Sequence, residues 1–123
     1  MRNLIQTALD NAFNGAVKAY WQRKIGSDAD EYIVYSLDGD VPENFADDEP
    51  LTKTGSVTLR YYYREKLLDT RAGRLAVESR ENAIAAAVEA AGFTIPNGKF
   101  DAGDVDDIGY GTTIFECEYW RVV

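Results

Sequence analysis

The stretch 56–63, SVTLRYYY, decides how the rest of the chain is interpreted. Large apolar or aromatic side chains occupy every second position, and more polar ones stand between them. The first set is Val57, Leu59, Tyr61 and Tyr63, and the second set is Thr58, Arg60 and Tyr62. Because successive side chains of a strand point to opposite faces, this alternation predicts a strand that presents one set to each side of a sheet.

Upstream of this strand, a helix and two further strands are predicted. Apolar residues recur at helical spacing from Asn3 to Phe13, and Asn14-Gly15 offers a left-handed end to that helix. The stretch AVKAYWQRK (16–24) fits either a continuation of the helix or a strand. A strand is preferred, because glycine inside a helix costs about 1 kcal/mol relative to alanine. The stretch YIVYSL (32–37) is rich in β-branched and aromatic residues, which predicts a strand.

Downstream, a long helix is predicted from an N-cap at Thr70 to a C-terminal cap at Gly92. The stretch FTIPNGKF (93–100) indicates a short strand broken by a turn, and TTIFECEYWRVV (112–123) indicates a closing strand. The element order is therefore α, β, β, β, α, β, β. This order predicts a single α+β domain over residues 1–123, a mostly antiparallel sheet of about five strands with two helices packed on one face.

Residues 38–55 are predicted to form a long loop, because glycines and prolines stand among six acids there. A second acidic loop is predicted at residues 101–111. Carboxylates are the ligands that Ca²⁺ and Mg²⁺ prefer. The first loop nevertheless departs from the calcium-loop pattern, with Pro42 at its fifth position and Glu43 where the turn glycine belongs. We expect solvated acidic loops, no metal site and no cofactor.

Composition argues against most kinds of enzyme. The 123 residues include no histidine and one cysteine, Cys117, which excludes histidine-based catalysis and an intramolecular disulfide. Cys117 lies on the apolar face of its predicted strand, where a cysteine is usually a buried hydrophobe. No pair of carboxylates stands out for glycoside chemistry. We therefore expect a protein that is not an enzyme.

The net charge of −8 disfavours specific nucleic-acid binding and anionic membranes, since both favour clustered Lys and Arg. The distribution of charge is more informative. Residues 38–49 contain six acids and no base, whereas six of the thirteen bases lie between residues 60 and 80. An acidic segment and a basic segment in one chain allow head-to-tail association of identical subunits. Alternatively, both regions are only solvated, because exposed ion pairs contribute about 0 to 1 kcal/mol.

One aromatic residue, Phe45, lies within the acidic segment, and aromatic anchors are favoured at interfaces. Alternatively, Phe45 folds back onto its own domain. The candidate partner-interface residues are Phe45, Asp47, Asp48, Glu49, Arg60, Arg64, Arg71 and Arg74.

Taken together, the N-terminal helix, YIVYSL, NFADDEPL, SVTLRYYY and a helix ending EAAGF resemble the tail completion proteins of long-tailed bacteriophages and prophages. These proteins are also called tail terminator or tail-to-head joining proteins. The resemblance covers residues 1–120, and FADDEPL and AAGF are its sharpest parts. The segment YYYREKLLDTRAGR is longer and more basic than the family pattern, which leaves the start of the second helix open.

The resemblance implies a structural subunit that forms a ring, commonly a hexamer, at the head-proximal end of the tail tube. The implied partners are further copies of the chain, the tail tube protein and the head-tail connector protein. The implied location is the virion, after assembly in the host cytoplasm. Two alternatives stay open: a phage head-tail adaptor, and a small acidic binding module or inhibitor of a basic host protein.

Overall fold

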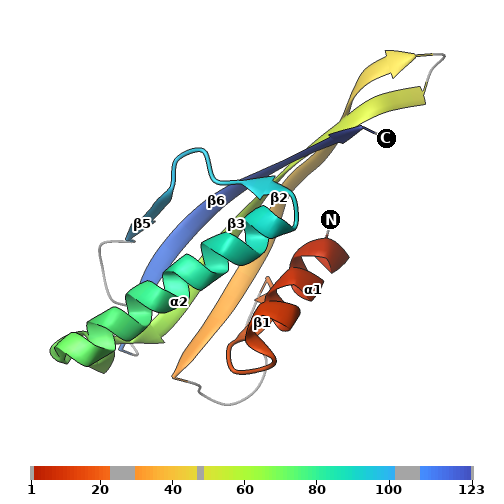
Figure 1. Ribbon diagram of the computed structural model, residues 1–123. Helices are drawn as coiled ribbons and strands as arrows, with labels where there is room; N and C mark the ends of the chain where they lie inside the picture. Colours follow the sequence, from red (N-terminus) through yellow and green to blue (C-terminus); the bar gives the residue numbers. More distant parts are fainter. Residues whose placement is uncertain (1, 23–29, 47–48, 102–108, 123) are drawn as a thin grey trace.

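The computed structural model describes residues 2–22, 30–46, 49–101 and 109–122, except for the side chains of residues 2–3, 38–46, 49–54 and 120–122. Figure 1 shows an elongated sheet with two helices. In chain order the elements are α1 (Arg2–Phe13), β1 (Lys18–Trp21), β2 (Glu31–Ala46), β3 (Glu49–Arg64), the 3₁₀ helix η1 (Glu65–Asp69), α2 (Arg71–Ala90), β4 (Phe93–Thr94), β5 (Lys99–Asp101) and β6 (Tyr110–Val122).

The described strands form one six-stranded sheet in the order β1-β2-β3-β6-β4, with β5 paired to β6. Only β1 and β2 are parallel, and the other described pairs are antiparallel. Both helices lie on the same face of the sheet (Figure 1). The predicted α+β class, the mostly antiparallel sheet and the placement of the helices are thus confirmed. The stretch 93–101 forms two short strands, β4 and β5, both paired with β6.

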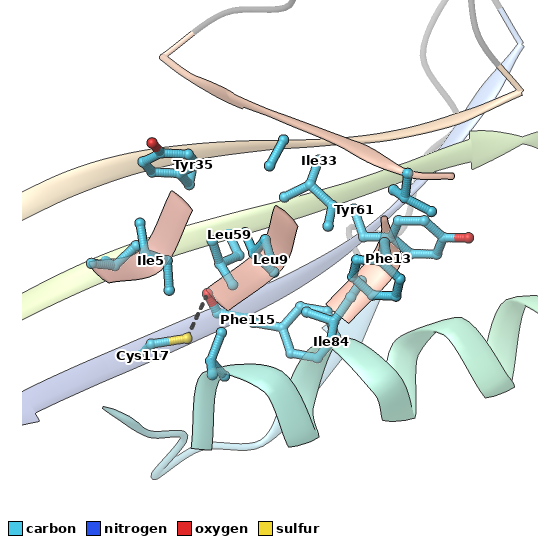
Figure 2. Packing of buried hydrophobic residues seen from close by; sticks show 14 of the residues in the cluster. Ile5, Leu9, Phe13, Ile33, Tyr35, Leu59, Tyr61, Ile84, Phe115 and Cys117 are labelled. Atoms are coloured by element: carbon cyan, nitrogen blue, oxygen red, sulfur yellow. Dashed lines mark hydrogen bonds between the residues drawn. The ribbon is translucent and has the colours of Figure 1, made fainter. Parts of the chain in front are cut away.

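The core lies between the sheet and the two helices (Figure 2). The odd-numbered residues of SVTLRYYY, from Val57 to Tyr63, are all buried on this side, as their alternation predicts. Each apolar side chain of this size that leaves water contributes about 1.5–3 kcal/mol to the free energy of folding. The core partners from the other main elements are Ile5, Leu9 and Phe13 on α1, Ile33 and Tyr35 on β2, Val77, Ile84 and Val88 on α2, and Phe115 and Cys117 on β6.

The ends of both helices lie close to their predicted positions. After α1, Asn14 and Gly15 have φ angles of 48° and 84°, the left-handed conformation expected of a helix end. At the start of α2, the Thr70 hydroxyl accepts a 3.0 Å hydrogen bond from the Gly73 amide, so Thr70 is the predicted N-cap. The helix begins at Arg71 despite Gly73, and it ends before Gly92, whose φ is 99°.

The prediction of a loop at residues 38–55 is wrong. Residues 39–46 of β2 pair in antiparallel register with residues 49–56 of β3, and a register shift between Leu37 and Gly39 marks where this ribbon begins. We call residues 39–46 and 49–56 the arm. Glycine, proline and acids favour turns locally, but the ladder of hydrogen bonds to the neighbouring strand outweighs that preference. Residues Thr52–Thr54 also pair with β6, and the arm extends past both helices (Figure 1).

Candidate interaction surfaces

The face of the sheet opposite the helices, which we call the open face, carries apolar side chains around an arginine. A continuous register joins one residue from each of five strands across it. These residues are Tyr20 on β1, Val34 on β2, Arg60 on β3, Ile114 on β6 and Phe100 on β5. The first four are half-buried, and Phe100 is 42% exposed. Aromatic residues and arginine are the types enriched at protein interfaces.

The second predicted arginine of β3, Arg64, is held by an aromatic cluster at one end of the open face. Its guanidinium carbon lies 4.4 Å from the ring centroid of Tyr110. The Tyr110 ring meets Tyr32 edge-on at 5.3 Å, and Tyr32 stacks on Tyr62 at 4.8 Å. Arg64 Nε also lies 4.0 Å from a carboxylate oxygen of the exposed Asp30. Arg60 and Arg64 therefore belong to one surface, as even-numbered residues of the same strand.

The other two predicted bases, Arg71 and Arg74, lie elsewhere. Both are exposed in the first turn of α2, on the helical side of the sheet, and Arg74 Nε donates a 2.7 Å hydrogen bond to the Leu68 carbonyl oxygen. The structure thus divides the predicted basic region into two groups on opposite sides of the sheet. Arg60 and Arg64 share the open face, whereas Arg71 and Arg74 flank the 3₁₀ helix.

Phe45 and Glu49 belong to the arm. Phe45 pairs with Pro50 and Ala46 with Glu49, so Phe45 and Glu49 lie at the end of the ribbon, although their side chains are not described. Asp47 and Asp48 lie outside the described residues. The described acids of the segment lie mostly on the second half of β2, whereas Arg60 and Arg64 lie in the second half of β3, away from the end of the ribbon.

Sequence reasoning missed a buried carboxylate on α2. Glu81 is 8% exposed; it accepts a hydrogen bond from the Thr113 hydroxyl and forms a 2.9 Å ion pair with Lys99. Its position gave a signal, because Glu81 falls within the apolar stripe of Val77, Ile84 and Val88 at helical spacing. The pair ties α2 to β5 and β6. Nearby, burial and the negative charges of Asp101 and Glu81 raise the pKa of Tyr63 above its ordinary value.

An apolar groove of about 440 Å³ runs between the outer surfaces of α1 and α2. Its lining is small and uncharged: Leu4, Thr7, Ala8, Asn11, Ala12, Ala87, Ala90 and Ala91. The alanines of AIAAAVEAA, which sequence analysis treats as helix formers, supply one wall. Thr7 and Asn11 supply the polar side chains of this lining and none of its residues is charged, so the groove offers shape but little chemistry.

Two features of the described residues bear on reactivity and metal binding. Cys117 is buried, and burial raises the pKa of its thiol to about 12, so the thiolate nucleophile is absent near neutral pH. Among the described residues, no cluster of three or more metal-ligating side chains is found.

Comparison with known proteins finds other chains with this fold but gives no information on function. No family model and no curated protein matches the sequence. Fifteen solved chains match the structure. One of them, which carries a serial designation in place of a descriptive name, matches with a TM-score of 0.54 and 12% identity, over 100% of this chain and 96% of that chain. Identity this low shows a shared fold alone. In the described part of the chain, the helices are too short or too polar to cross a membrane.

Proposed function

We propose that the chain is a structural subunit of a bacteriophage tail, which forms a ring that caps the tail tube and helps to join the tail to the head. The observation that carries this proposal is the arm. It projects beyond the helices as a paired ribbon, and residues 38–49, which include its first strand, contain six acids and no base. A projecting, charged ribbon at one end of a small domain is suited to reaching a neighbouring subunit.

The separation of charge along the sheet supports a ring over a symmetric pair. Because acids cluster on the second half of β2, and Arg60 and Arg64 lie in the second half of β3, away from that segment, identical subunits bind best head to tail, with different surfaces meeting at each contact. Such contacts close into rings when the rotation between subunits allows it. The proposed ring is a hexamer, the form that the sequence resemblance implies, and its further partners are the tail tube protein and the connector protein.

The test is electron microscopy of particles from a phage or induced prophage that lacks this gene. We expect filled heads separate from tails, with tails of irregular length, because nothing would end tube growth or form the joint. Supplying the intact gene in trans is the control, and it should restore joined particles. Intact, infectious particles without the gene would contradict the proposal and favour an acidic module that binds a basic host protein.

A further inference from the structure

Arg60 is the most distinctive feature of the open face. It is half-buried between Val34 and Ile114 in the row that crosses the sheet. Within the described part of the chain, no ion-pair partner of Arg60 is found. A guanidinium that is partly removed from water gains most from a carboxylate, which it can bind through two parallel hydrogen bonds.

The arm supplies carboxylates, but the arm of the same copy cannot reach this surface. The acid of the arm nearest to Arg60 along the strands is Asp40, which pairs with Gly55, five residues before Arg60 on β3. At a rise of about 3.3 Å per residue, the two positions are roughly 17 Å apart, beyond the reach of one ion pair. Pairing with β2 on one side and β6 on the other keeps this strand extended. An arm that covers Arg60 must therefore come from another molecule.

The charges of the open face also set the direction from which an arm approaches. Glu116 pairs with Thr58 and Glu118 with Ser56, so both exposed acids lie on the half of the face nearer to the arm. Arg60 and Arg64 lie on the other half. An acidic ribbon is repelled from the first half and attracted to the second, so it binds over the arginines.

Two other binding modes fit the arm less well. The groove between α1 and α2 is lined by uncharged residues, so the acids of the arm would find no partner there. Pairing along the free edge of β2 is opposed by Pro42, which has no N–H, by the register shift after Leu37, and by the acids of the strand. These are the features by which sheet edges avoid pairing.

We propose that the open face, centred on Arg60, is the docking surface for the acidic arm of a second copy of this chain. Each copy then offers an arm at one end and an arginine-centred surface at the other. This inference rests on the proposed function for the closure of such contacts into a ring, and it names the two surfaces that meet.

A charge exchange tests the two surfaces directly. One variant is Arg60→Glu, and the other is Glu43→Lys with Glu49→Lys in the arm. We expect each variant alone to associate about tenfold more weakly than the unaltered chain in sedimentation velocity, because like charges then meet. Mixing the two variants should restore association, since every contact of an alternating assembly again joins opposite charges. Arg71→Glu is the matched control, with the same charge change on the helical side, and it should associate normally.

Several results would overturn the inference. They are an unaltered chain that stays monomeric at its highest soluble concentration, an Arg60→Glu variant that associates normally, an Arg71→Glu variant that is weakened equally, and a mixture that does not recover. Loss of association through Ala87→Arg alone would place the contact in the helical groove. Circular dichroism of each variant distinguishes a lost contact from a lost fold.

Adding the same proteins to a lysate that lacks the gene separates this inference from the proposed function. If the unaltered chain and the mixed variants associate but no lysate gains infectious particles, the docking surface stands and the tail function is wrong. If the unaltered chain and the Arg60→Glu variant restore particles equally well, the tail function stands and the docking surface is wrong.

Discussion

Arg80 binds both carboxylate oxygens of Glu31, with Nε 2.9 Å from Oε1 and Nη2 3.2 Å from Oε2. The Tyr61 hydroxyl also donates a 2.7 Å hydrogen bond to Oε1. The middle of α2 is thereby joined to the first residue of β2 and to the C-terminal part of β3. Arg80, one of the six bases that lie between residues 60 and 80, acts here inside the fold, with its guanidinium 5.2 Å from the Phe13 ring centroid.

Replacing Glu31 should therefore destabilise the fold far more than replacing its neighbour. Glu31→Leu leaves a half-buried guanidinium and a tyrosine hydroxyl without their acceptor. We expect a loss of about 1–3 kcal/mol in the free energy of unfolding, measured by urea titration. Asp30→Leu removes the same charge one residue earlier, from an exposed pair, and should cost about 0.5 kcal/mol or less. Equal losses in the two variants would show that the Glu31 network contributes little.

A second prediction concerns Gly73, which is buried in the first turn of α2. A Cβ atom added there would collide with the Leu67 carbonyl oxygen of η1. In an unobstructed helix, glycine to alanine gains about 1 kcal/mol. Gly73→Ala should instead lose about 1–3 kcal/mol, because the obstacle is backbone and cannot rotate away. Ala76→Gly, at an exposed position of the same helix, is the control and should lose about 1 kcal/mol. A stabilised Gly73→Ala variant would contradict the packing of η1 against α2.

The strand SVTLRYYY and the arm show how far the sequence predicts this structure. Alternation in SVTLRYYY and the helical spacing of Val77, Ile84 and Val88 are local patterns with one-sided burial, and they predicted the strands, the helices and the core face. The arm was missed because its strands are stabilised by pairing with each other and, over residues 52–56, with β6, whereas its glycines, prolines and acids favour loops when each residue is considered alone. The division of the basic residues between two surfaces was also missed, because the sequence alone does not show on which side of the sheet α2 begins.

A third prediction follows from Cys117, whose thiol pKa is raised by burial from 9.0 to about 12. A raised folded-state pKa means that the unfolded chain loses this proton first. The free energy of unfolding is therefore unaffected by ionisation of this thiol below about pH 9. It declines as the pH rises from 9 towards 12, by about 1.4 kcal/mol per pH unit for this group. In the Cys117→Ala variant, the free energy of unfolding should fall less steeply with pH over that range, although the variant is less stable at neutral pH. Identical slopes would show that the thiol ionises freely in the folded state.

Tyr61 contributes a second pH effect in both proteins. Its pKa is raised mainly by burial and next by its hydrogen bond to Glu31, so the free energy of unfolding falls further above about pH 10.

The last prediction separates the arm from the folded body. The cross-strand triple of Leu37, Val57 and Cys117 is the part of the described core nearest to the arm, and the register shift follows it immediately. Replacing residues 40–55 by Asn-Gly, the preferred sequence of a tight hairpin turn, should leave this triple in place. We expect the free energy of unfolding to change by about 1 kcal/mol or less, because the buried core residues that the structure describes lie outside the arm. Urea titration measures the stability, and sedimentation velocity measures association, which we expect to be lost. A chain that unfolds without its arm would show that the arm supports the core; one that still associates would show that another surface joins the copies.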